Sequence, residues 1–396
     1  MATFSVRFLG CKVSHTDAQA VRERLAGDGH VERRGAADVA VVNTCCVTHE
    51  AIRKSRQAAA RAARTHARVY VTGCGANLGR DAFAGLAPNV LVVPGPTEAA
   101  AAAVAGDVGA IACVRADHRL DRVRAFVKIQ DGCSFRCSFC VIPLVRGASR
   151  SRPAAAVLRE VHRRVEQGHR EIVLTGVNLG CYRDREEQID LPRLVRAAGE
   201  TPDLARLRLS SIEVNHLTPE LCSALRETPA AAQHLHVPLQ SGDDGVLRAM
   251  RRRYDSAAYL RRIALLADFN LTTDAIVGFP GEDDGAFERT LAVVDAAGIT
   301  KVHVFPYSPR PGTGTAASDP VPPAVKKARG ARLREHSRER CLARWRDKIG
   351  REDLVLVDRP GRGYGDDYSP WLVRGEVGTL VRAHARAVTE EGILAA

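Results

Sequence analysis

Three cysteines stand close together near the middle of the chain, at Cys133, Cys137 and Cys140. Three and then two residues separate them, a spacing typical of thiolates that share an iron–sulfur cluster or a metal ion. A structural zinc ion closes its tetrahedral shell with four protein ligands, whereas this group supplies three. Three ligands on a four-iron cluster leave one iron open. The spacing therefore predicts a [4Fe-4S] cluster whose open iron can hold a substrate or a cofactor.

Two other uses of close cysteines fit the sequence less well. The chain has 11 cysteines, an odd number, and no hydrophobic signal segment follows Met1. These features indicate a reducing, cytoplasmic compartment, in which structural disulfides are rare. A zinc ribbon needs a second close pair of cysteines, and the adjacent Cys45 and Cys46 are too tightly spaced for one. Cluster binding is the favoured interpretation.

Three further cysteines each follow an expected buried strand. The strand-like runs are residues 4–8, 39–43 and 69–73. Cys11, Cys45 and Cys74 follow them, and the carboxyl ends of parallel strands gather ligands at one edge of a sheet. A single such cysteine is more often a small buried hydrophobe, but three together favour a shared ligand. We therefore expect an open parallel α/β domain with a second three-thiolate cluster, and Cys46 stays unassigned.

Composition indicates a globular chain of two or three domains. It has 396 residues, of which 45% are hydrophobic, enough for packed cores. The formal net charge of +12 suits a polyanionic partner such as RNA but is also ordinary for an arginine-rich chain. No run of 18 uncharged apolar residues occurs, so we expect no membrane span and no membrane partner.

The central segment has the pattern of a parallel barrel. Its expected strands are residues 126–129, 171–174, 206–209, 232–237, 272–277 and 301–305. Helical stretches such as residues 154–167 and 257–269 alternate with them. Six βα units predict a partial (β/α)6 barrel similar to a TIM barrel, with its active-site loops at the carboxyl ends of the strands.

The cysteine motifs resemble those of the radical S-adenosylmethionine (SAM) methylthiotransferases. Residues 8–13 (FLGCKV), 42–45 (VNTC) and 71–74 (VTGC) resemble the three cysteine motifs of that family's N-terminal domain, and residues 132–147 (GCSFRCSFCVIPLVRG) resemble its radical-SAM motif. The resemblance extends through residues 174–180, 208–213, 234–242, 276–282 and 304–313. It therefore covers nearly the whole chain.

The resemblance implies two [4Fe-4S] clusters and SAM as cofactors. In the family, the cluster at the positions of Cys133, Cys137 and Cys140 reductively cleaves SAM to a 5′-deoxyadenosyl radical, which abstracts hydrogen from the substrate. The second cluster, at the positions of Cys11, Cys45 and Cys74, would hold or supply the sulfur after a second SAM has methylated it. Two clusters account for two sets of three cysteines, while the electron donor and the sulfur source stay unassigned.

Residues at the expected barrel mouth are candidates for contacts to SAM. Phe139 could pack near an adenine, and the small Gly176 would let a methionine group approach closely. Glu213 and Gln240 offer hydrogen bonds to ribose hydroxyls or polar substrate groups. The remaining candidates are Ser211 and Gly278. Ser211 and Glu213 could instead cap a neighbouring loop, and residues 278–281 could form an ordinary turn.

The substrate expected from the resemblance is a tRNA. Residues 128–132, 175–180 and 304–310 look most like the branch that acts at C2 of N6-threonylcarbamoyladenosine next to the anticodon, although Asn178 and Cys181 depart from it. An unpaired loop base needs no duplex to be opened. The alternatives are isopentenyladenosine in tRNA and an aspartate of a ribosomal protein. An alternative of another class is a non-catalytic RNA-binding protein whose iron–sulfur clusters are structural.

Basic helices and a β-rich tail point to contact with the tRNA anticodon stem-loop. Residues 51–68 and 323–348 are expected to be basic helices. Strand-like runs at 354–357, 371–373 and 379–383 resemble a short TRAM domain, a small RNA-binding β-barrel. The expected domains are residues 1–115 with the auxiliary cluster, 119–322 with the radical-SAM barrel, 323–348 as a helical connector and 349–396 as the TRAM-like barrel.

Overall fold

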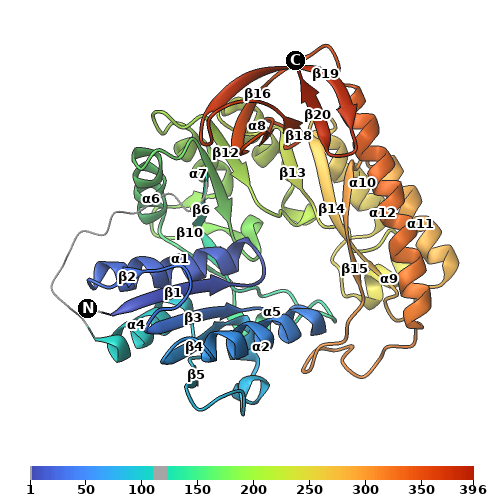
Figure 1. Ribbon diagram of the computed structural model, residues 1–396. Coiled ribbons are helices and arrows are strands. Elements are labelled where there is room, and N and C mark those ends of the chain that lie inside the picture. The colour runs from blue at the N-terminus through green and yellow to red at the C-terminus, as the bar shows by residue number, and fades with distance from the viewer. Residues whose placement is uncertain (1, 110–122) are drawn as a thin grey trace. The chain divides into compact units, whose positions relative to one another are not determined.

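The computed structural model describes residues 2–109 and 123–396 of the chain (Figure 1). Its backbone contacts divide the chain into two compact units. The first unit comprises Met1–Arg119, Asp131–Ser149 and Ser308–Ala316, and the second comprises Leu120–Gln130, Arg150–Tyr307 and Ala317–Ala396. The expected domain boundary at 115–119 lies outside the described residues, and the other boundaries stay predictions.

The first unit is built on a parallel five-stranded sheet. In chain order its elements are β1 (Thr3–Phe8), α1 (Lys12–Gly27), β2 (Val31–Glu32), β3 (Val39–Thr44), α2 (His49–Ala63), β4 (Arg68–Gly73), α3 (Cys74–Leu78), the 3-10 helix η1 (Arg80–Phe83), β5 (Val90–Val92), α4 (Thr97–Val108) and α5 (Ile142–Arg146). The strand order is β2-β1-β3-β4-β5, and every neighbouring pair is parallel. This confirms the expected open parallel α/β fold.

Both faces of this sheet are covered, which explains why its central strands are apolar runs. Val39, Val41 and Tyr70 pack on one face with residues of α1 and α4. Val42 and Val71 pack on the other face, against α2 and α3. The helices of the blue segment lie on both sides of the sheet in Figure 1.

The first basic helix is shorter than the sequence indicates. Thr48 begins α2, because its side chain accepts a hydrogen bond from the backbone N–H of Ala51 at 3.1 Å. The expected helix continued to residue 68, but α2 ends at Ala63. Arg68 instead begins β4, opposite Val39 of β3. Strand pairing therefore overrides the helical pattern at this end.

The second unit contains six parallel strands and the helices between them. Its elements are β6 (Arg124–Lys128), β8 (Arg150–Ser151), α6 (Ala154–Glu166), β9 (Glu171–Thr175), η2 (Leu179–Cys181), β10 (Arg183–Asp184), β11 (Ile189–Asp190), α7 (Leu191–Gly199), β12 (Arg206–Leu209), η3 (Val214–His216), α8 (Pro219–Glu227), β13 (His234–His236), α9 (Asp244–Ala249), α10 (Ser256–Ile263), η4 (Ala264–Leu266), β14 (Asn270–Val277), α11 (Asp284–Ala296), β15 (Lys301–Pro306), α12 (Pro323–Arg346), β16 (Glu352–Arg359), β17 (Arg362–Tyr364), β18 (Pro370–Leu372), β19 (Leu380–Thr389) and β20 (Gly392–Ala395). The short strand β7 (Gln130–Asp131) spans the division between the units.

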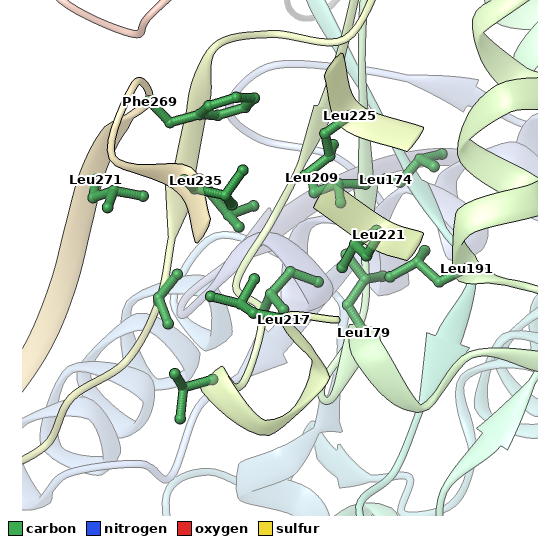
Figure 2. Packing of buried hydrophobic residues seen from close by; sticks show 14 of the residues in the cluster. Leu174, Leu179, Leu191, Leu209, Leu217, Leu221, Leu225, Leu235, Phe269 and Leu271 are labelled. Atoms are coloured by element: carbon green, nitrogen blue, oxygen red, sulfur yellow. The ribbon is translucent and has the colours of Figure 1, made fainter. Parts of the chain in front are cut away.

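An open parallel barrel is formed by the strands β6, β9, β12, β13, β14 and β15. They pair as β6-β9-β12 and β13-β14-β15, and single parallel bridges from Leu207 to Ala231 and from Ser211 to His236 connect the two groups. Leucines and other apolar residues fill the space between strands and helices, as Figure 2 shows for residues including Leu174, Leu209 and Leu235. The expected partial barrel is confirmed, although the helix expected over 257–269 ends at Ile263 and continues as η4.

The C-terminal segment is a closed five-stranded barrel. Its strands follow each other in the order β16-β17-β18-β20-β19, and Trp371 lies 1% exposed in its core. Closure removes the open edges that a sheet of such short strands would otherwise present. The small β-barrel expected from the tail is therefore present, with a fourth and a fifth strand that the sequence analysis did not assign.

Most of the cationic side chains of the basic helix α12 form ion pairs with other residues of the second unit. Arg332 pairs with Glu288, and Arg340 pairs with Asp295 at 2.6 Å. Further pairs join Lys326 to Asp319, Arg329 to Glu282 and Asp284, Arg344 to Asp367, and Lys348 to Asp353 and Asp367. These pairs tie the helix to its neighbours, so contact between α12 and RNA phosphates stays a prediction. Among the described residues, no helix has the length and apolar character needed to cross a bilayer.

Candidate metal and cofactor site

Cys11, Cys45 and Cys74 lie at the carboxyl ends of three neighbouring strands. Cys11 is the N-cap residue of α1, just beyond β1. Cys45 directly follows β3, and Cys74 directly follows β4 and begins α3. The strand order reverses direction between β1 and β3, the position at which open α/β sheets bind their ligands. The fold thus places the dispersed cysteines where such a sheet gathers a ligand.

The three thiols are close enough to influence one another's ionisation. The pKa of Cys74 is raised to about 12, chiefly by burial; Arg146 opposes this rise, and the neighbouring Cys11 and Cys45 add to it. Burial also raises the pKa of Cys45, with Cys11 contributing in the same direction. A bound metal would favour the thiolates that burial disfavours.

Gly10 lets the loop after β1 approach Cys45. Its φ of +121° lies in the region that favours glycine. A Cβ at this position would lie 3.1 Å from the Cβ of Cys45 and 3.3 Å from its Sγ. Any larger residue would therefore crowd a candidate ligand.

Cys46 is buried in an apolar cluster beside these thiols. Its side chain is 0% exposed and packs with Val141 and Val145 from the segment around α5. Burial raises the pKa of the Cys46 thiol. Its backbone carbonyl accepts a hydrogen bond from Nη1 of Arg310 at 3.4 Å. These contacts give Cys46 a packing role.

Cys133, Cys137 and Cys140 lie on an irregular loop of the first unit, and all three are partly exposed. Gly132 begins this loop with a φ of +69°, and a Cβ there would overlap the carbonyl of Ala148. The backbone N–H of Cys133 donates to the carbonyl of Gly147 at 3.0 Å, which closes the loop at its base.

The donor set of this loop fits an iron–sulfur cluster. Among the described residues, no three His, Cys, Asp or Glu side chains converge on one point that could hold a single metal ion. A four-iron cluster instead takes its thiolates on separate irons. The backbone N–H of Phe135 points at Sγ of Cys133 at 3.4 Å, a contact that suits a thiolate acceptor. Thr315 holds the same loop, because its N–H donates to the carbonyl of Ser138 at 3.0 Å.

Arg146 is a residue of the site that the sequence analysis missed. It stands inside the radical-SAM motif, and the only signal in the sequence was a cation six residues after Cys140. The structure buries its guanidinium against Cys74, Asp17 and Asp131 within the first unit. Neither the periodicity of the sequence nor its motifs predict that Arg146 contacts Cys74, Asp17 and Asp131.

The candidate SAM contacts are divided between the two units. Phe139 belongs to the cluster loop of the first unit. The other candidates lie in the second unit, each shortly after the carboxyl end of a parallel strand: Gly176 after β9, Ser211 and Glu213 after β12, Gln240 after β13 and Gly278 after β14. Contact of any of them with SAM stays a prediction.

The structure gives several of these residues protein partners. Glu213 forms an ion pair with Arg252, and burial raises the pKa of its carboxyl group. A Cβ at Gly176 would lie 2.9 Å from Oε1 of Gln130, so Gln130 fills the space that the missing side chain leaves. A side chain at Gly278 would overlap Cγ of Lys326. The two glycines thus have packing reasons of their own.

Two family models match the chain. Residues 127–294 match the Radical SAM superfamily, and residues 3–95 match Uncharacterized protein family UPF0004. The first match covers most of the open barrel, and the second covers the N-terminal parallel sheet.

Curated relatives match the chain over most of its length. The threonylcarbamoyladenosine tRNA methylthiotransferase MtaB of Thermotoga maritima is 32% identical over 431 residues, covering 100% of this chain and 96% of the relative. MtaB of Bacillus subtilis is 35% identical over 361 residues, covering 84% and 80%. The tRNA-2-methylthio-N(6)-dimethylallyladenosine synthase of Novosphingobium aromaticivorans is 36% identical over 399 residues, covering 93% and 90%.

A solved structure shares the fold at low sequence identity. The radical S-adenosylmethionine methyltransferase TsrM of Kitasatospora setae, with cobalamin and a [4Fe-4S] cluster bound, aligns with a TM-score of 0.58 and 15% identity. The alignment covers 80% of this chain and 77% of TsrM. At this identity the likeness concerns the fold alone.

Proposed function

The chain belongs to the radical SAM tRNA methylthiotransferase family, and from this membership we propose that it inserts a methylthio group at C2 of N6-threonylcarbamoyladenosine next to the anticodon of tRNA. The observation that carries the proposal is the placement of Cys11, Cys45 and Cys74 just beyond the carboxyl ends of three neighbouring strands of the first unit. That trio, separate from the one at Cys133, supports two clusters rather than one.

The residues of the two trios would hold the cofactors. Cys133, Cys137 and Cys140 would bind the cluster that, together with SAM, supplies the 5′-deoxyadenosyl radical. Cys11, Cys45 and Cys74 would bind the auxiliary cluster involved in sulfur insertion. The chain's own task is to position the target adenine and to exclude competing reactions.

Five residues of the second unit and Phe139 of the first are proposed to position SAM. The β-strand ends at which Ser211, Gln240 and Gly278 stand are the usual place for active-site residues in barrels of this kind. Glu213 is held by Arg252, which fixes the direction of its carboxylate. Gln130 accepts a hydrogen bond from the backbone N–H of Asn178 at 2.8 Å and so supports the loop after Gly176.

A basic strand of the C-terminal barrel is proposed to contact the tRNA anticodon stem-loop. Along β19, Ala383 and Ala385 point into the barrel, while Arg382, His384 and Arg386 alternate with them and are exposed. This alternation places three basic side chains in a row on one face. Such a row suits the regularly spaced phosphates of an RNA strand.

Changing Arg382 and Arg386 together to glutamine is expected to weaken tRNA binding and to lower the slope of log affinity against log salt by about 1 to 2. Binding titrations with the substrate tRNA at several salt concentrations measure both quantities. Arg196→Gln is the matched control, because Arg196 lies on α7, outside the elements proposed to contact RNA, and its loss is expected to leave the slope unchanged. An unchanged slope in the double variant would remove β19 from the RNA-binding surface.

Isopentenyladenosine in tRNA is the second candidate substrate. The relative from Novosphingobium aromaticivorans, a dimethylallyladenosine synthase by name, is 36% identical, slightly above the 32% of MtaB from Thermotoga maritima. The MtaB relative covers 100% of the chain, and the motif resemblance favours the same branch. Identity alone does not separate the two substrates.

Mass spectrometry of tRNA nucleosides tests the substrate. In a strain without the gene, we expect the methylthio derivative of N6-threonylcarbamoyladenosine to disappear and N6-threonylcarbamoyladenosine itself to remain. Loss of methylthio-isopentenyladenosine instead would establish the second candidate. If both nucleosides persist and a ribosomal-protein aspartate loses its methylthio group, the substrate is a protein.

The electron donor and the sulfur source are separate partners whose identities the proposal leaves open. A cytoplasmic location belongs to the proposal, because cluster thiolates require a reducing compartment and the substrate tRNA must be present in it. Absence of 5′-deoxyadenosine after anaerobic reconstitution with iron, sulfide, SAM and a reductant would defeat the radical mechanism and favour the alternative of a non-catalytic RNA-binding protein.

A further inference from the structure

Arg146 donates hydrogen bonds to three buried acceptors of the first unit. It ends α5, and only 6% of its side chain is exposed. Its Nη2 donates to Oδ2 of Asp17 at 2.6 Å, and its Nη1 donates to Oδ1 of Asp131 at 3.0 Å. Its Nε donates to Sγ of Cys74, also at 3.0 Å. One guanidinium therefore joins α1, the start of the cluster loop and a candidate ligand of the other trio.

Both carboxylates are held in place by a second donor. Oδ1 of Asp17 accepts a hydrogen bond from Oγ1 of Thr97 at 2.7 Å. Oδ1 of Asp131 accepts one from the backbone N–H of Gly132 at 2.8 Å, next to Cys133. These fixed carboxylates hold the planar guanidinium in one orientation. The Nε–H is thereby directed at the sulfur of Cys74.

This arrangement suits an anionic sulfur. A neutral thiol is only a weak acceptor, whereas a thiolate accepts a charge-assisted hydrogen bond. An arginine guanidinium stays charged in proteins, and the carboxylates of Asp17 and Asp131 pair with this one at 2.6 and 3.0 Å. Stability alone gives little reason to keep such a buried charge, because apolar side chains of similar volume often stabilise as well.

We propose that Arg146 is a positioning residue for the auxiliary cluster, which it serves by fixing the Cys74 thiolate and raising the reduction potential of the cluster. Hydrogen bonds and positive charge at the ligand sulfurs stabilise the reduced, more negative form of a cluster. Through Asp131, the same guanidinium fixes Cys74 relative to the start of the loop that carries Cys133. The proposal rests on the assignment of Cys11, Cys45 and Cys74 as ligands under the proposed function.

The test isolates the auxiliary cluster in the full-length chain. In the parent variant, alanine replaces Cys133, Cys137 and Cys140, so that reconstituted iron and sulfide report only the other trio. Arg146→Gln is then added, and the midpoint potential is measured by a redox titration followed by electron paramagnetic resonance. We expect the cluster to be retained and its potential to become more negative. Arg146→Lys keeps the charge and is expected to restore part of the shift.

Asn77→Ala is the matched control. Nδ2 of Asn77 donates to the carbonyl of Val145 at 2.8 Å, so this residue also holds α5. Its loss should loosen α5 and leave the potential at the parent value. An equal shift in Asn77→Ala, or an unchanged potential in Arg146→Gln, would overturn the role of Arg146. If the Gln variant does not fold, Arg146→Lys is compared with the parent, and a smaller shift to a more negative potential is expected; an unchanged potential would overturn the role of Arg146.

Activity gives an independent readout in the chain with all its cysteines. Arg146→Gln is expected to reduce methylthiolation by about 10- to 100-fold while 5′-deoxyadenosine formation continues. Equal loss of both activities would assign Arg146 to the radical-generating cluster and overturn the proposal. Absence of any cluster signal in the triple-alanine parent is a different result, because it would refute the ligand assignment of Cys11, Cys45 and Cys74 itself.

Discussion

Alanine in place of Cys133 is expected to stop 5′-deoxyadenosine formation and methylthiolation together, whereas alanine in place of Cys74 is expected to stop methylthiolation alone. Under the proposed function, each cluster would need all three of its thiolates, because the fourth iron must stay open. The same two outcomes are expected for the other members of each trio, Cys137 and Cys140 on one side and Cys11 and Cys45 on the other.

Both products can be measured in one reconstituted reaction. Liquid chromatography quantifies 5′-deoxyadenosine, mass spectrometry quantifies the methylthio nucleoside, and iron analysis shows which cluster is missing. Cys46→Ala is the matched control, since this buried cysteine packs against Val141 and Val145. It should keep both activities and the full iron content. Loss of methylthiolation in Cys46→Ala, with retention in Cys45→Ala, would transfer the ligand role to Cys46.

The N-terminal sheet could be predicted because its strands are strongly apolar and end at cysteines. Residues 39–43 and 69–73 predicted β3 and β4 to within a residue at each end. Such runs are continuous because both faces of the sheet are covered. The order of the strands was not readable from the sequence. It depends on which helix covers which face, as the packing of Tyr70 with α1 and α4 illustrates.

The sequence pointed to candidate ligands of the site but not to their neighbours. Spacing singled out Cys133, Cys137 and Cys140, strand ends singled out the other trio, and the ligand role of both trios stays a prediction. The partners of these residues come from distant segments, as when Arg310 donates to the carbonyl of Cys46, 264 residues away. Hydrogen bonds of this kind are properties of the folded chain, since their donors and acceptors have no fixed spacing.

The basic helix α12 shows that a count of charges does not tell how many of them already have partners within the protein. The ten Lys and Arg residues between positions 324 and 348 suggested a phosphate-binding surface. In the structure, Arg329 and Arg340 reach carboxylates on or next to α11, and Lys348 reaches Asp367 in the C-terminal barrel. A sequence records how many charges a helix carries but not which of them are already paired.

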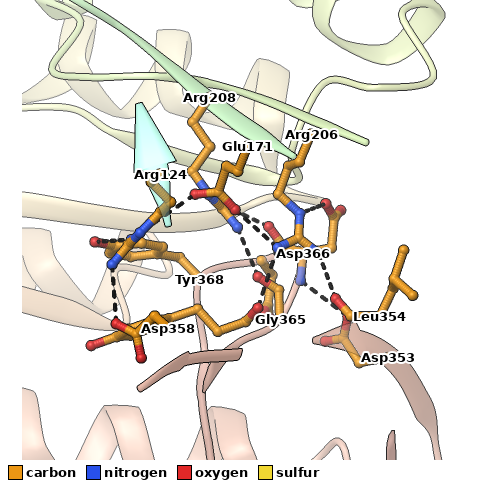
Figure 3. A network of polar contacts seen from close by, with 12 residues as sticks. Arg124, Glu171, Arg206, Arg208, Asp353, Leu354, Asp358, Gly365, Asp366 and Tyr368 are labelled. Carbon is orange, nitrogen blue, oxygen red and sulfur yellow. Dashed lines mark hydrogen bonds and ion pairs between the residues drawn. The ribbon is translucent and has the colours of Figure 1, made fainter. Parts of the chain in front are cut away.

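Glu171→Gln is expected to destabilise the second unit by about 3–5 kcal/mol. Glu171 is 1% exposed and accepts hydrogen bonds from Nη1 of Arg206 at 3.0 Å and from Nε of Arg208 at 2.9 Å (Figure 3). Both arginines are also buried, and they donate onward to the C-terminal barrel, Arg206 to Asp366 and Arg208 to the carbonyl of Gly365. A neutral amide would remove the carboxylate that the two buried guanidinium groups share, leaving Arg206 with Asp366 and Arg208 with backbone carbonyls.

Acid should reproduce part of this loss. Burial alone would raise the pKa of Glu171, but Arg208, Arg206 and Arg124 outweigh it, so the pKa lies below its ordinary value. A lowered pKa in the folded state means that the stabilisation is complete above the unfolded-state pKa and is lost as the pH falls through the folded-state value. The stability of Glu171→Gln should therefore depend less on pH in the acid range.

Thermal unfolding across pH and limited proteolysis measure these effects. Arg206 and Arg208 connect β12 to the C-terminal barrel. Glu171→Gln should therefore speed cleavage near residues 347–351, between α12 and β16. Glu227→Gln is the matched control, because its pair with Arg196 is exposed and should leave unfolding unchanged. If the two variants unfold alike, the buried pairs are not what holds the C-terminal barrel to the parallel strands. The barrel would then depend on the contacts that do not involve Glu171, such as the hydrogen bond from Asn270 to the carbonyl of Asp367 at 2.6 Å.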